Sequence, residues 1–519
     1  MRNKVIDAQE AAALVPDGAT LGTVGGGGGL VEADTLLAAV EERFLSTGAP
    51  RGLRVIHSLG IGDRDRRGLN RLAYEGLVRK VIGGHWIWSP RMQALAREEK
   101  IEAYILPAGV TAQLMREIGA GRPGLITHVG LGTFVDPRQD GGRMNRSAQD
   151  ELVELIEIDG RTLLRYKPFP VDVALLRGSY ADVDGNISME EEPANLEAFA
   201  MALAAHNSGG AVVFQVRGLV EAGGIPARQV RIPGALVDAV VVAPEQPQCH
   251  AFFYDPSISG QQKEREYFDA GQGKPIERDE TPGPRAVIAH RAAQELFENA
   301  VINFGFGIPD GVAKLVAARG ETERYYQTIE HGTYGGELLD GVLFGFARNA
   351  SCMIDSPSQF DLYGGGGLDI AFLGFGEMDG RGNVNVSRLG GTTVGPGGFI
   401  DIAQNARTVV FCGAFEAKGV DYEVGEHSVT VKRYGQIRKL VDEVDQITFS
   451  GRHALASGQK VLCITERAVF ALTLEGMCLR EVAPGIDLKA DVLDRMGFAP
   501  IVPAELPLMP FLAGGRASD

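Results

Sequence analysis

Two stretches of this chain, roughly 200 residues apart, follow the same pattern. Residues 172–188 open with Asp-Val-Ala and residues 369–383 with Asp-Ile-Ala, and each leads into an apolar run typical of a buried strand. A Gly-Asn pair then stands at the same distance from the aspartate in both stretches. So long a period excludes a solenoid, whose repeats span about 20–50 residues. We therefore expect two diverged copies of one domain.

The fold class of each copy follows from the segments that precede these stretches. Residues 19–29 and residues 300–309 are each an apolar run that ends in glycines, and apolar residues at helical spacing follow. Strand, glycine turn and helix make half of a parallel-sheet unit. The 69 glycines exceed the usual share of about 7% and fit many tight turns of this kind. The prediction is an α/β protein with two similar open α/β domains in tandem, each with a largely parallel sheet and glycine-rich βα loops.

The region between the two copies lacks a regular apolar pattern. It contains several prolines, a Ser-Ile-Ser-Gly segment and a charged run, which indicate a connector. We predict an N-terminal domain over residues 1–242, a connector over 243–285 and a C-terminal domain over 286–519. A chain of 519 residues is long enough for two separate cores.

The composition disfavours several classes of function. A formal net charge of −16 disfavours binding to nucleic acid, but an anionic small substrate can still bind at helix N-termini. The five cysteines include no CxxC pair and mostly stand in apolar runs, so we expect core thiols in a reduced, cytoplasmic protein and no metal site. No apolar run approaches the length of a membrane span, and residues 511–519 are expected to fray.

A single carboxylate stands at the end of a predicted strand in the second copy. Residues 325–329 have a β-type composition, and Glu330 follows them. Three glycines then turn the backbone, at positions 332, 335 and 336. Open α/β folds bind their ligands at this rim of the sheet. Glu330 can act there as a general base or as a nucleophile, and the alternative is that it only caps a surface turn.

Three glycine-lined segments of the second half are expected to meet at one edge of its sheet. They span residues 332–336, 364–367 and 395–398, each near the end of a predicted strand. Backbone N–H groups in such loops can stabilise a developing oxyanion. We therefore expect a ligand to lie close to backbone there.

Other reactive side chains offer weaker alternatives. His331 adjoins Glu330, but neighbours in an extended segment point to opposite faces, which favours a non-catalytic role. Cys352 and Cys412 lack the electropositive, His-paired surroundings that activate a thiol. Asp172 and Asp369 open buried strands and are either a ligand pair or, more ordinarily, partners of the local backbone.

Several segments resemble those of a known family. The motif Glu-His-Gly-Thr-Tyr-Gly-Gly at residues 330–336 and the segment Gly-Pro-Gly-Gly-Phe-Ile-Asp at residues 395–401 are similar to segments of the family I coenzyme A transferases. The resemblance is greatest to the single-chain propionate (acetate/3-ketoacid) CoA-transferases. Further matching pieces cover nearly the whole chain, at residues 130–138, 207–210, 382–387, 399–405, 464–467 and 483–488.

The resemblance implies roles for individual residues. Glu330 would be the nucleophile that carries a glutamyl-CoA thioester, and Gly398 would supply an oxyanion-stabilising amide. Contacts with CoA are expected at four glycines, namely Gly366, Gly367, Gly395 and Gly397.

The chain departs from the family pattern at two places. The family usually has Pro-Gln-Gly in the N-terminal domain, where the glutamine is the second oxyanion donor, and here Ala108 takes its place. Losing one such donor costs about 2.7–4 kcal/mol. Either a water or another side chain substitutes, or the enzyme is slower or uses a different acyl group; Gln113 is near in sequence but falls on the following helix. The second departure is Val31 before Glu32, where the family often has Pro-Glu.

The function implied is transfer of coenzyme A from a short-chain acyl-CoA to a carboxylic acid such as acetate, propionate or a 3-oxoacid. It runs through an acyl-glutamyl anhydride and a glutamyl-CoA thioester, with CoA as a substrate and with no metal or resident cofactor. The expected partners are the acyl-CoA and the carboxylate, without nucleic acid or membrane, in a homo-oligomer. Two alternatives stay open, an acyl-CoA hydrolase at the same site, favoured by Ala108, and a non-catalytic CoA-binding protein. A dehydrogenase is disfavoured, because no Gly-x-Gly-x-x-Gly joins a strand to a helix.

Overall fold

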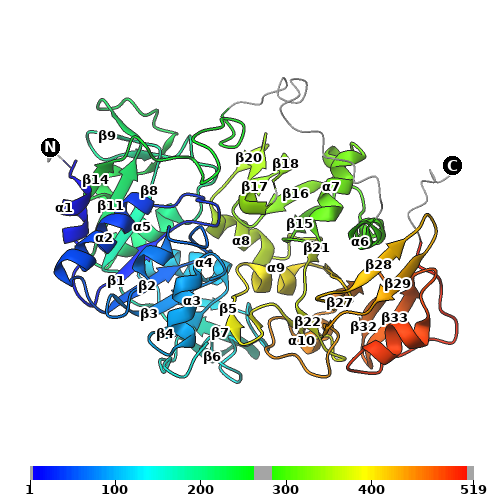
Figure 1. The fold of residues 1–519 in the computed structure, drawn as a ribbon. Helices are drawn as coiled ribbons and strands as arrows, with labels where there is room; N and C mark the ends of the chain where they lie inside the picture. Colours follow the sequence, from blue (N-terminus) through cyan, green and yellow to red (C-terminus); the bar gives the residue numbers. More distant parts are fainter. Residues whose placement is uncertain (1–3, 262–282, 340, 511–519) are drawn as a thin grey trace. The chain divides into compact units, whose positions relative to one another are not determined.

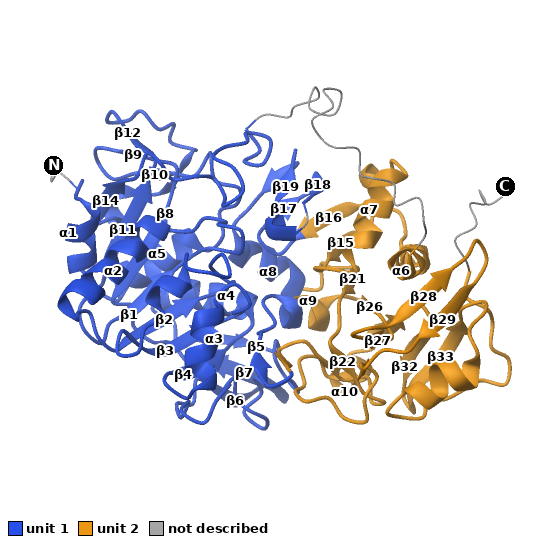
Figure 2. Cartoon of the chain, in the orientation of Figure 1, with its two compact units in different colours: residues 1–263, 329–364, 390–401 blue, residues 264–328, 365–389, 402–519 orange. Residues whose placement is uncertain are grey.

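The structure is a computed structural model that describes residues 4–261, 283–339 and 341–510. The chain divides into two compact units, coloured separately in Figure 2. Unit 1 comprises Met1–Lys263, Ile329–Gly364 and Gly390–Asp401, and unit 2 comprises Glu264–Thr328, Gly365–Leu389 and Ile402–Asp519.

Unit 1 therefore contains segments from both halves of the sequence. Glu330 and residues 395–398 belong to the same compact unit as the N-terminal sheet. The predicted domain limits of 1–242, 243–285 and 286–519 stay a prediction. Residues 262–282 of the connector and the tail at 511–519 lie outside the described residues.

The larger sheet of unit 1 has seven strands, and all neighbouring pairs are parallel. Across the sheet they are β14 (Ala239–Val242), β11 (Ala211–Val216), β8 (Val173–Arg177), β1 (Thr20–Thr23), β2 (Leu53–His57), β3 (Val78–Gly83) and β4 (Glu102–Ile105). Most of their residues are apolar and buried, as is usual for strands of a parallel sheet. They lie side by side in the blue-to-green part of Figure 1.

One helix, α4 (Ala108–Gly119), lies at the centre of unit 1. It packs against α5 (Ala198–Asn207) and α8 (Ser356–Gly364), and most of its residues are buried. The other helices of unit 1 are α1 (Ala8–Ala13), α2 (Asp34–Thr47) and α3 (Pro90–Arg97). The N-terminus of α4 is therefore held inside the unit.

Two smaller sheets complete the N-terminal part of unit 1. One is antiparallel and consists of β5 (Leu125–Thr127), β7 (Arg161–Tyr166) and β6 (Val153–Ile158). The other consists of β12 (Gly218–Val220), β9 (Tyr180–Asp182), β10 (Ile187–Ser188) and β13 (Val230–Ile232). The β6–β7 hairpin turns at Asp159 and Gly160, which both have positive φ, as a two-residue hairpin loop requires.

Unit 2 is built on a sheet of similar kind. In order its strands are β16 (Tyr326–Ile329), β15 (Val301–Phe304), β21 (Ile370–Leu373), β26 (Thr408–Cys412), β31 (Lys460–Ile464), β32 (Ala468–Thr473) and β33 (Gly476–Val482). The pairs from β16 to β31 are parallel, and β32 and β33 are antiparallel additions. Its helices are α6 (Pro284–Ala292), α7 (Asp310–Ala318) and α10 (Gly451–Ala456), while α9 (Phe399–Asn405) begins in unit 1.

The two sheets repeat one arrangement, which confirms the prediction of two similar α/β domains. The order β14-β11-β8-β1-β2 in unit 1 matches β31-β26-β21-β15-β16 in unit 2. Asp172 accepts a hydrogen bond from the Thr20 amide at 2.7 Å, and Asp369 accepts one from the Val301 amide at 3.0 Å. Both aspartates thus tie neighbouring strand starts together, as backbone partners and not as a ligand pair.

The Gly-Asn pair also repeats in three dimensions. Asn186 donates to Asp182 at 2.8 Å, and Asn383 donates to Asp379 at 2.9 Å. In each case the aspartate also accepts from the backbone amide of the asparagine, at 2.9 Å and 3.0 Å. The Gly-Asn pair therefore recurs in the sequence because the two copies share this turn.

The cysteines follow the sequence-based expectation with one exception. All five are unpaired, and Cys249, Cys412, Cys463 and Cys478 are buried. Cys352 is exposed, because it lies on the short strand β20 (Cys352–Met353), which pairs only with β17 (Thr333–Tyr334) among the described residues. Within the parts of the chain that the structure describes, no helix has the length and apolar character to cross a membrane.

Candidate active site

Glu330 follows the last residue of β16, at the turn that leads into β17. The turn closes as the Gly332 amide donates to the carbonyl of Ile329 at 2.9 Å. Gly332 has a φ of +98°, and a Cβ there would lie 2.3 Å from the carbonyl oxygen of Ile354. Only glycine fits this position. The arrangement of strand, carboxylate and glycine turn is therefore present in the structure.

The carboxylate of Glu330 packs directly against Gly398. A Cβ at Gly398 would lie 2.0 Å from Glu330 Oε2 and 3.3 Å from the ring of Phe360. The Glu330 side chain is 20% exposed. Burial raises the pKa of Glu330 to about 7. At neutral pH a large share of Glu330 is therefore ionised, and the higher pKa makes the ionised form more nucleophilic than an ordinary carboxylate.

The loop that contains Gly398 is fixed by hydrogen bonds between backbones. The Gly397 amide donates to the carbonyl of Gly84 at 2.9 Å, and the Gly397 carbonyl accepts from the amide of Ala108 at 2.9 Å. Gly395 and Gly397 have φ values of +82° and +56°, which favour glycine. Among the residues that the structure describes, the Gly398 N–H meets no acceptor. A rigid loop thus leaves one backbone donor next to the Glu330 carboxylate.

Asp401 is a second buried carboxyl group in the same region. It accepts hydrogen bonds from the amides of Gly109 and Val110, each at 3.1 Å, at the N-terminus of α4. A Cβ at Gly109 would lie 2.5 Å from Asp401 Oδ1 and 2.4 Å from the ring of Phe360. Burial and the nearby charge of Glu330 raise the pKa of Asp401 to about 8. The two carboxyl groups thus share the environment of one aromatic ring.

The sequence reasoning did not single out Asp401. The residue stands in the Phe-Ile-Asp segment directly after the third glycine loop, two positions beyond an apolar Phe. A charged residue in the first turn of a helix is ordinary. Its burial beside Glu330 depends on tertiary packing, which the local pattern does not show.

His331 is buried beside Glu330. Its Nδ1 lies 3.1 Å from the carbonyl oxygen of Gly345, and because a carbonyl only accepts, Nδ1 carries the proton. Its Nε2 is then an acceptor and lies 3.9 Å from Glu330 Oε1. Burial lowers the pKa of His331 to about 4, so the ring is neutral at pH 7. A non-catalytic role for His331 stays a prediction.

The run of glycines after β1 is packed tightly. A Cβ at Gly27 would lie 2.2 Å from the ring of Trp88, and one at Gly28 would lie 2.1 Å from the carbonyl oxygen of Val342. Val342 stands three residues before Gly345, the partner of His331. This glycine run therefore contacts the segment that supports His331, and through it the surroundings of Glu330.

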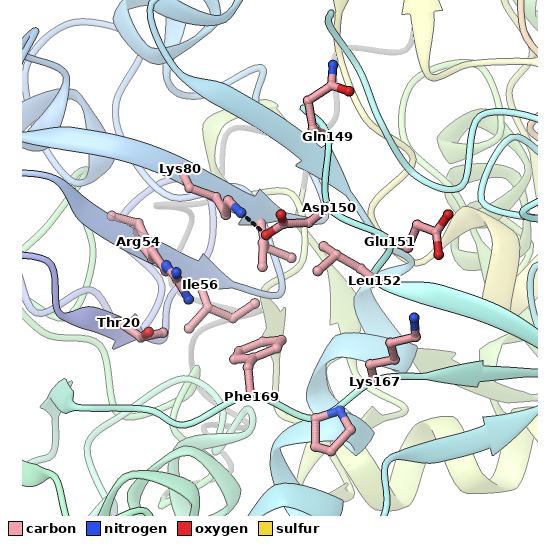
Figure 3. Close-up of a pocket in the computed structure, with 13 residues that line it drawn as sticks. Thr20, Arg54, Ile56, Lys80, Gln149, Asp150, Glu151, Leu152, Lys167 and Phe169 are labelled. Atoms are coloured by element: carbon pink, nitrogen blue, oxygen red, sulfur yellow. Dashed lines mark hydrogen bonds and ion pairs between the residues drawn. The ribbon is translucent and has the colours of Figure 1, made fainter. Parts of the chain in front are cut away.

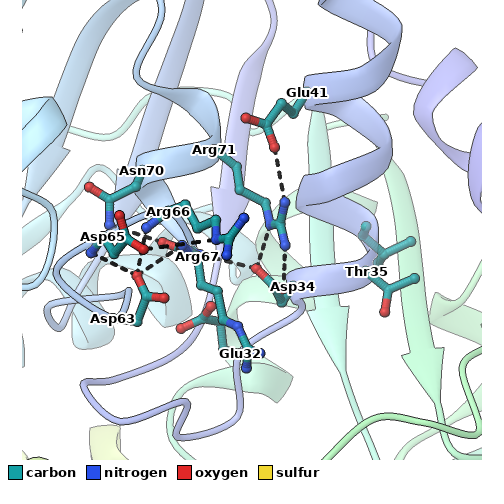
Figure 4. A network of polar contacts seen from close by, with 12 residues as sticks. Glu32, Asp34, Thr35, Glu41, Asp63, Asp65, Arg66, Arg67, Asn70 and Arg71 are labelled. Carbon is teal, nitrogen blue, oxygen red and sulfur yellow. Dashed lines mark hydrogen bonds and ion pairs between the residues drawn. The ribbon is translucent and has the colours of Figure 1, made fainter. Parts of the chain in front are cut away.

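A network of charged side chains fixes the helix that follows this glycine run (Figure 4). Arg71 donates to both oxygens of Asp34, at 2.7 and 2.8 Å, and reaches Glu41 at 3.0 Å. Glu32, at the second departure from the family pattern, is buried, and His250 Nε2 lies 3.7 Å from its Oε1. Burial raises the pKa of Glu32.

Known proteins match this chain over nearly its whole length. The family model described as "Coenzyme A transferase" matches residues 5–243. Acetate CoA-transferase YdiF of Escherichia coli (strain K12) is 41% identical over 98% of this chain and 94% of its own. Caffeate CoA-transferase of Acetobacterium woodii is 44% identical over 97% of this chain and 96% of its own. A crystal structure of the acyl-CoA transferase YdiF from E. coli O157:H7, a thioester complex with CoA, has a TM-score of 0.91 and 40% identity over 98% of this chain and 95% of that one.

The chain belongs to the coenzyme A transferase family. It is a single-chain α/β enzyme that transfers CoA between an acyl-CoA and a carboxylate. The predicted family, fold class and enzyme class are thereby confirmed.

In this CoA-transferase, Ala108 stands where the resemblance predicts a glutamine as the second oxyanion donor, and that assignment stays a prediction. Ala108 is buried as the first residue of α4, and a methyl group cannot donate a hydrogen bond. Gln113 does not replace the donor, because its amide donates to Asp361 at 2.8 Å. Gln113 therefore serves the packing of α4 on α8.

The predicted CoA-binding glycines fall in different units. Gly395 and Gly397 belong to unit 1 and lie in the loop of Gly398, whereas Gly366 and Gly367 belong to unit 2. Their contacts with CoA stay predictions. Over the described ranges, no group of three or more His, Cys, Asp or Glu side chains is placed to hold a metal ion.

The buried thiols of Cys412 and Cys463 are poorly suited to act as nucleophiles. Burial raises the pKa of Cys412 far above its ordinary value and raises that of Cys463 to about 12. Both thiols therefore stay protonated at neutral pH.

Proposed function

We propose that this CoA-transferase carries CoA on Glu330 while it exchanges CoA between short-chain acids. The observation that supports this is the contact of Glu330 Oε2 with Gly398, where even a Cβ would lie only 2.0 Å away. The nucleophile and a backbone donor for the oxyanion then stand side by side. Glycine at this position lets the reacting carbonyl approach both.

The reaction starts from ionised Glu330. One carboxylate oxygen attacks the thioester carbonyl of the acyl-CoA, and the Gly398 amide stabilises the charge that develops on the carbonyl oxygen. The carbon–sulfur bond breaks, CoA leaves as a thiolate, and an acyl-glutamyl anhydride remains. The thiolate then attacks the glutamyl carbonyl, so that the donor acid leaves as a carboxylate and a glutamyl-CoA thioester forms. The acceptor carboxylate runs the same steps in reverse and leaves as a CoA ester.

The proposed acids are acetate, propionate or a 3-oxoacid. The E. coli relative is named for acetate and the A. woodii relative for caffeate, at similar identities of 41% and 44%. The acceptor panel of any test therefore needs both an aliphatic and an aromatic acid. The proposal includes a homo-oligomer in the cytoplasm, and the unpaired cysteines fit a reducing compartment.

A second function is favoured by one observation. Ala108 and the engaged Gln113 leave the oxyanion with fewer donors than the family usually provides. A slow second transfer gives water time to attack the anhydride or the thioester, and the enzyme then acts as an acyl-CoA hydrolase.

Intact mass spectrometry separates these functions. Incubation with acetyl-CoA and no acceptor is expected to add the mass of CoA minus one water to the protein, and Glu330→Ala is expected to show no such adduct. The matched control is Glu337→Ala, which removes another glutamate of the same segment and keeps the adduct. Steady release of free acetate without an acceptor supports the hydrolase. An adduct of unchanged yield in Glu330→Ala contradicts the proposal.

A further inference from the structure

Unit 1 contains a cavity of about 530 Å³ that none of the residues of the Glu330 site lines. Its walls come from β1, β2 and β3 and from residues 149–152 and 167–169, which flank the β6–β7 hairpin (Figure 3). Pockets for small organic molecules measure about 300–1,000 Å³. The wall residue nearest in sequence to Gly84, the partner of the Gly398 loop, is Ile82, two residues before it, and the cavity shares no lining residue with the Glu330 site. The cavity is therefore separate from the candidate active site.

One face of the sheet presents a polar row and an apolar row to this cavity. Thr20, Arg54 and Lys80 are register partners across β1, β2 and β3. Ile56 and Ile82 stand two residues further along their strands, so they point to the same side. A ligand that fits these rows has a polar head and an apolar body.

Arg54 is the charged side chain of this row that lacks a partner. Lys80 is paired with Glu102 at 2.7 Å and with Asp150. The Arg54 side chain makes no hydrogen bond and no ion pair with any residue that the structure describes, and its Nε is buried. A buried donor left unsatisfied costs roughly 1–3 kcal/mol. A ligand that supplies an acceptor to this Nε–H would remove that cost.

The remaining charges of the cavity gather away from Arg54. In Figure 3 Arg54 lies near Thr20 and Ile56, whereas Glu151 and Lys167 stand on the other side of the pocket. Lys167 Nζ lies 3.4 Å from a carboxylate oxygen of Glu154. Arg54 also helps to lower the pKa of Asp150, so this end of the cavity has three cations, Arg54, Arg79 and Lys80, against the two carboxylates of Glu102 and Asp150, and one positive charge is in excess.

We propose that this cavity binds a small monocarboxylate with a short apolar chain. The carboxylate binds the guanidinium of Arg54 through two parallel hydrogen bonds, a geometry that the planar fork of arginine favours. The chain covers Ile56, Ile82 and the ring of Phe169. An inorganic oxyanion leaves these apolar side chains uncovered, which favours the organic acid. The proposal does not depend on the role of Glu330.

Fluorine NMR titration with 4,4,4-trifluorobutyrate tests the proposal. Arg54→Gln is expected to weaken binding at this site at least tenfold, and lengthening the chain from two to four carbons is expected to strengthen binding to the parent protein. The matched control is Arg79→Gln on β3, which removes the same charge from an exposed side chain and changes binding less than twofold. Inorganic phosphate is expected not to displace the probe.

Two further measurements test whether the acid binds in this cavity and not at the Glu330 site. Thioester formation from acetyl-CoA is followed in parallel, and Arg54→Gln is expected to leave it intact, which separates this cavity from the Glu330 site. Crystals of the parent protein soaked in 4-bromobutyrate are expected to show anomalous bromine density next to Ile56 and Phe169, whether or not a variant folds. Unchanged binding in Arg54→Gln, displacement by phosphate, or bromine density found only elsewhere overturns the proposal.

Discussion

Replacing Gly398 by alanine tests whether the position of the Glu330 carboxylate governs the reaction. The added Cβ would lie 2.0 Å from Glu330 Oε2 and 2.8 Å from its Cδ, distances that real Cβ atoms do not show. The backbone of Gly398 does not adopt a positive φ, so alanine causes no backbone strain there. The amide that would stabilise the oxyanion also remains. The substitution therefore acts on the carboxylate.

The magnitude follows from the distances. To reach an ordinary contact, the Glu330 carboxylate or the loop must move by about 1 Å or more, and a misplacement of about 1 Å costs roughly 100-fold in rate. This equals about 2.7 kcal/mol in the activation free energy. Gly398→Ala is thus expected to slow thioester formation roughly 100-fold while the protein stays folded.

The assay is rapid-quench intact mass spectrometry with acetyl-CoA, together with thermal unfolding. The control is Gly218→Ala on β12, where the new Cβ would meet Tyr180 at an ordinary 3.4 Å. This control is expected to form the thioester at the parent rate. A Gly398→Ala protein that reacts within threefold of the parent would refute the positioning argument.

Three further predictions concern the surroundings of Glu330. The rate of thioester formation rises with pH and levels off above about 7, because only ionised Glu330 attacks and burial raises its pKa to about 7; a single-turnover profile with its midpoint near 4.5 contradicts this. Asp401 is largely protonated while Glu330 ionises, because burial and the charge of Glu330 raise the pKa of Asp401 to about 8; Asp401→Asn is therefore expected to leave that midpoint near 7, and a midpoint that moves well to lower pH shows that Asp401 carries the charge instead. Ala108→Gln adds a side-chain donor and is expected to raise the rate of thioester formation by up to about 100-fold. Ala108→Met, of similar size but without a donor, is expected not to raise this rate, and equal rates in the two variants refute the donor argument.

The fold was largely predictable because the two copies use the same residue types for the same contacts. Asp172 and Asp369 each bind the amide that starts the neighbouring strand, so the same residue recurs at the same place in both copies. The Gly-Asn pairs recur because each asparagine closes a turn on an aspartate four residues earlier. Contacts of this kind leave a pattern in the sequence.

Which segments of the chain make up unit 1 could not be predicted in the same way. Residues 329–364 and 390–401 cluster with the N-terminal sheet, although they are distant from it in the chain. Asp401 is placed by amides of α4 that lie almost 300 residues earlier. Arg54 stands out only once its strand is known to be part of a parallel sheet with a cavity over it. Each of these features depends on which segments pack together, and no local periodicity records that.

Locating the covalent adduct tests the central claim most directly. Protein trapped with acetyl-CoA is digested, and the modified peptide is sequenced by tandem mass spectrometry. The account predicts CoA linked to Glu330 with the loss of one water. A mixed disulfide at the exposed Cys352 would instead show the loss of two hydrogens. Rapid CoA transfer with no adduct on Glu330, or with the adduct on another residue, would contradict the account.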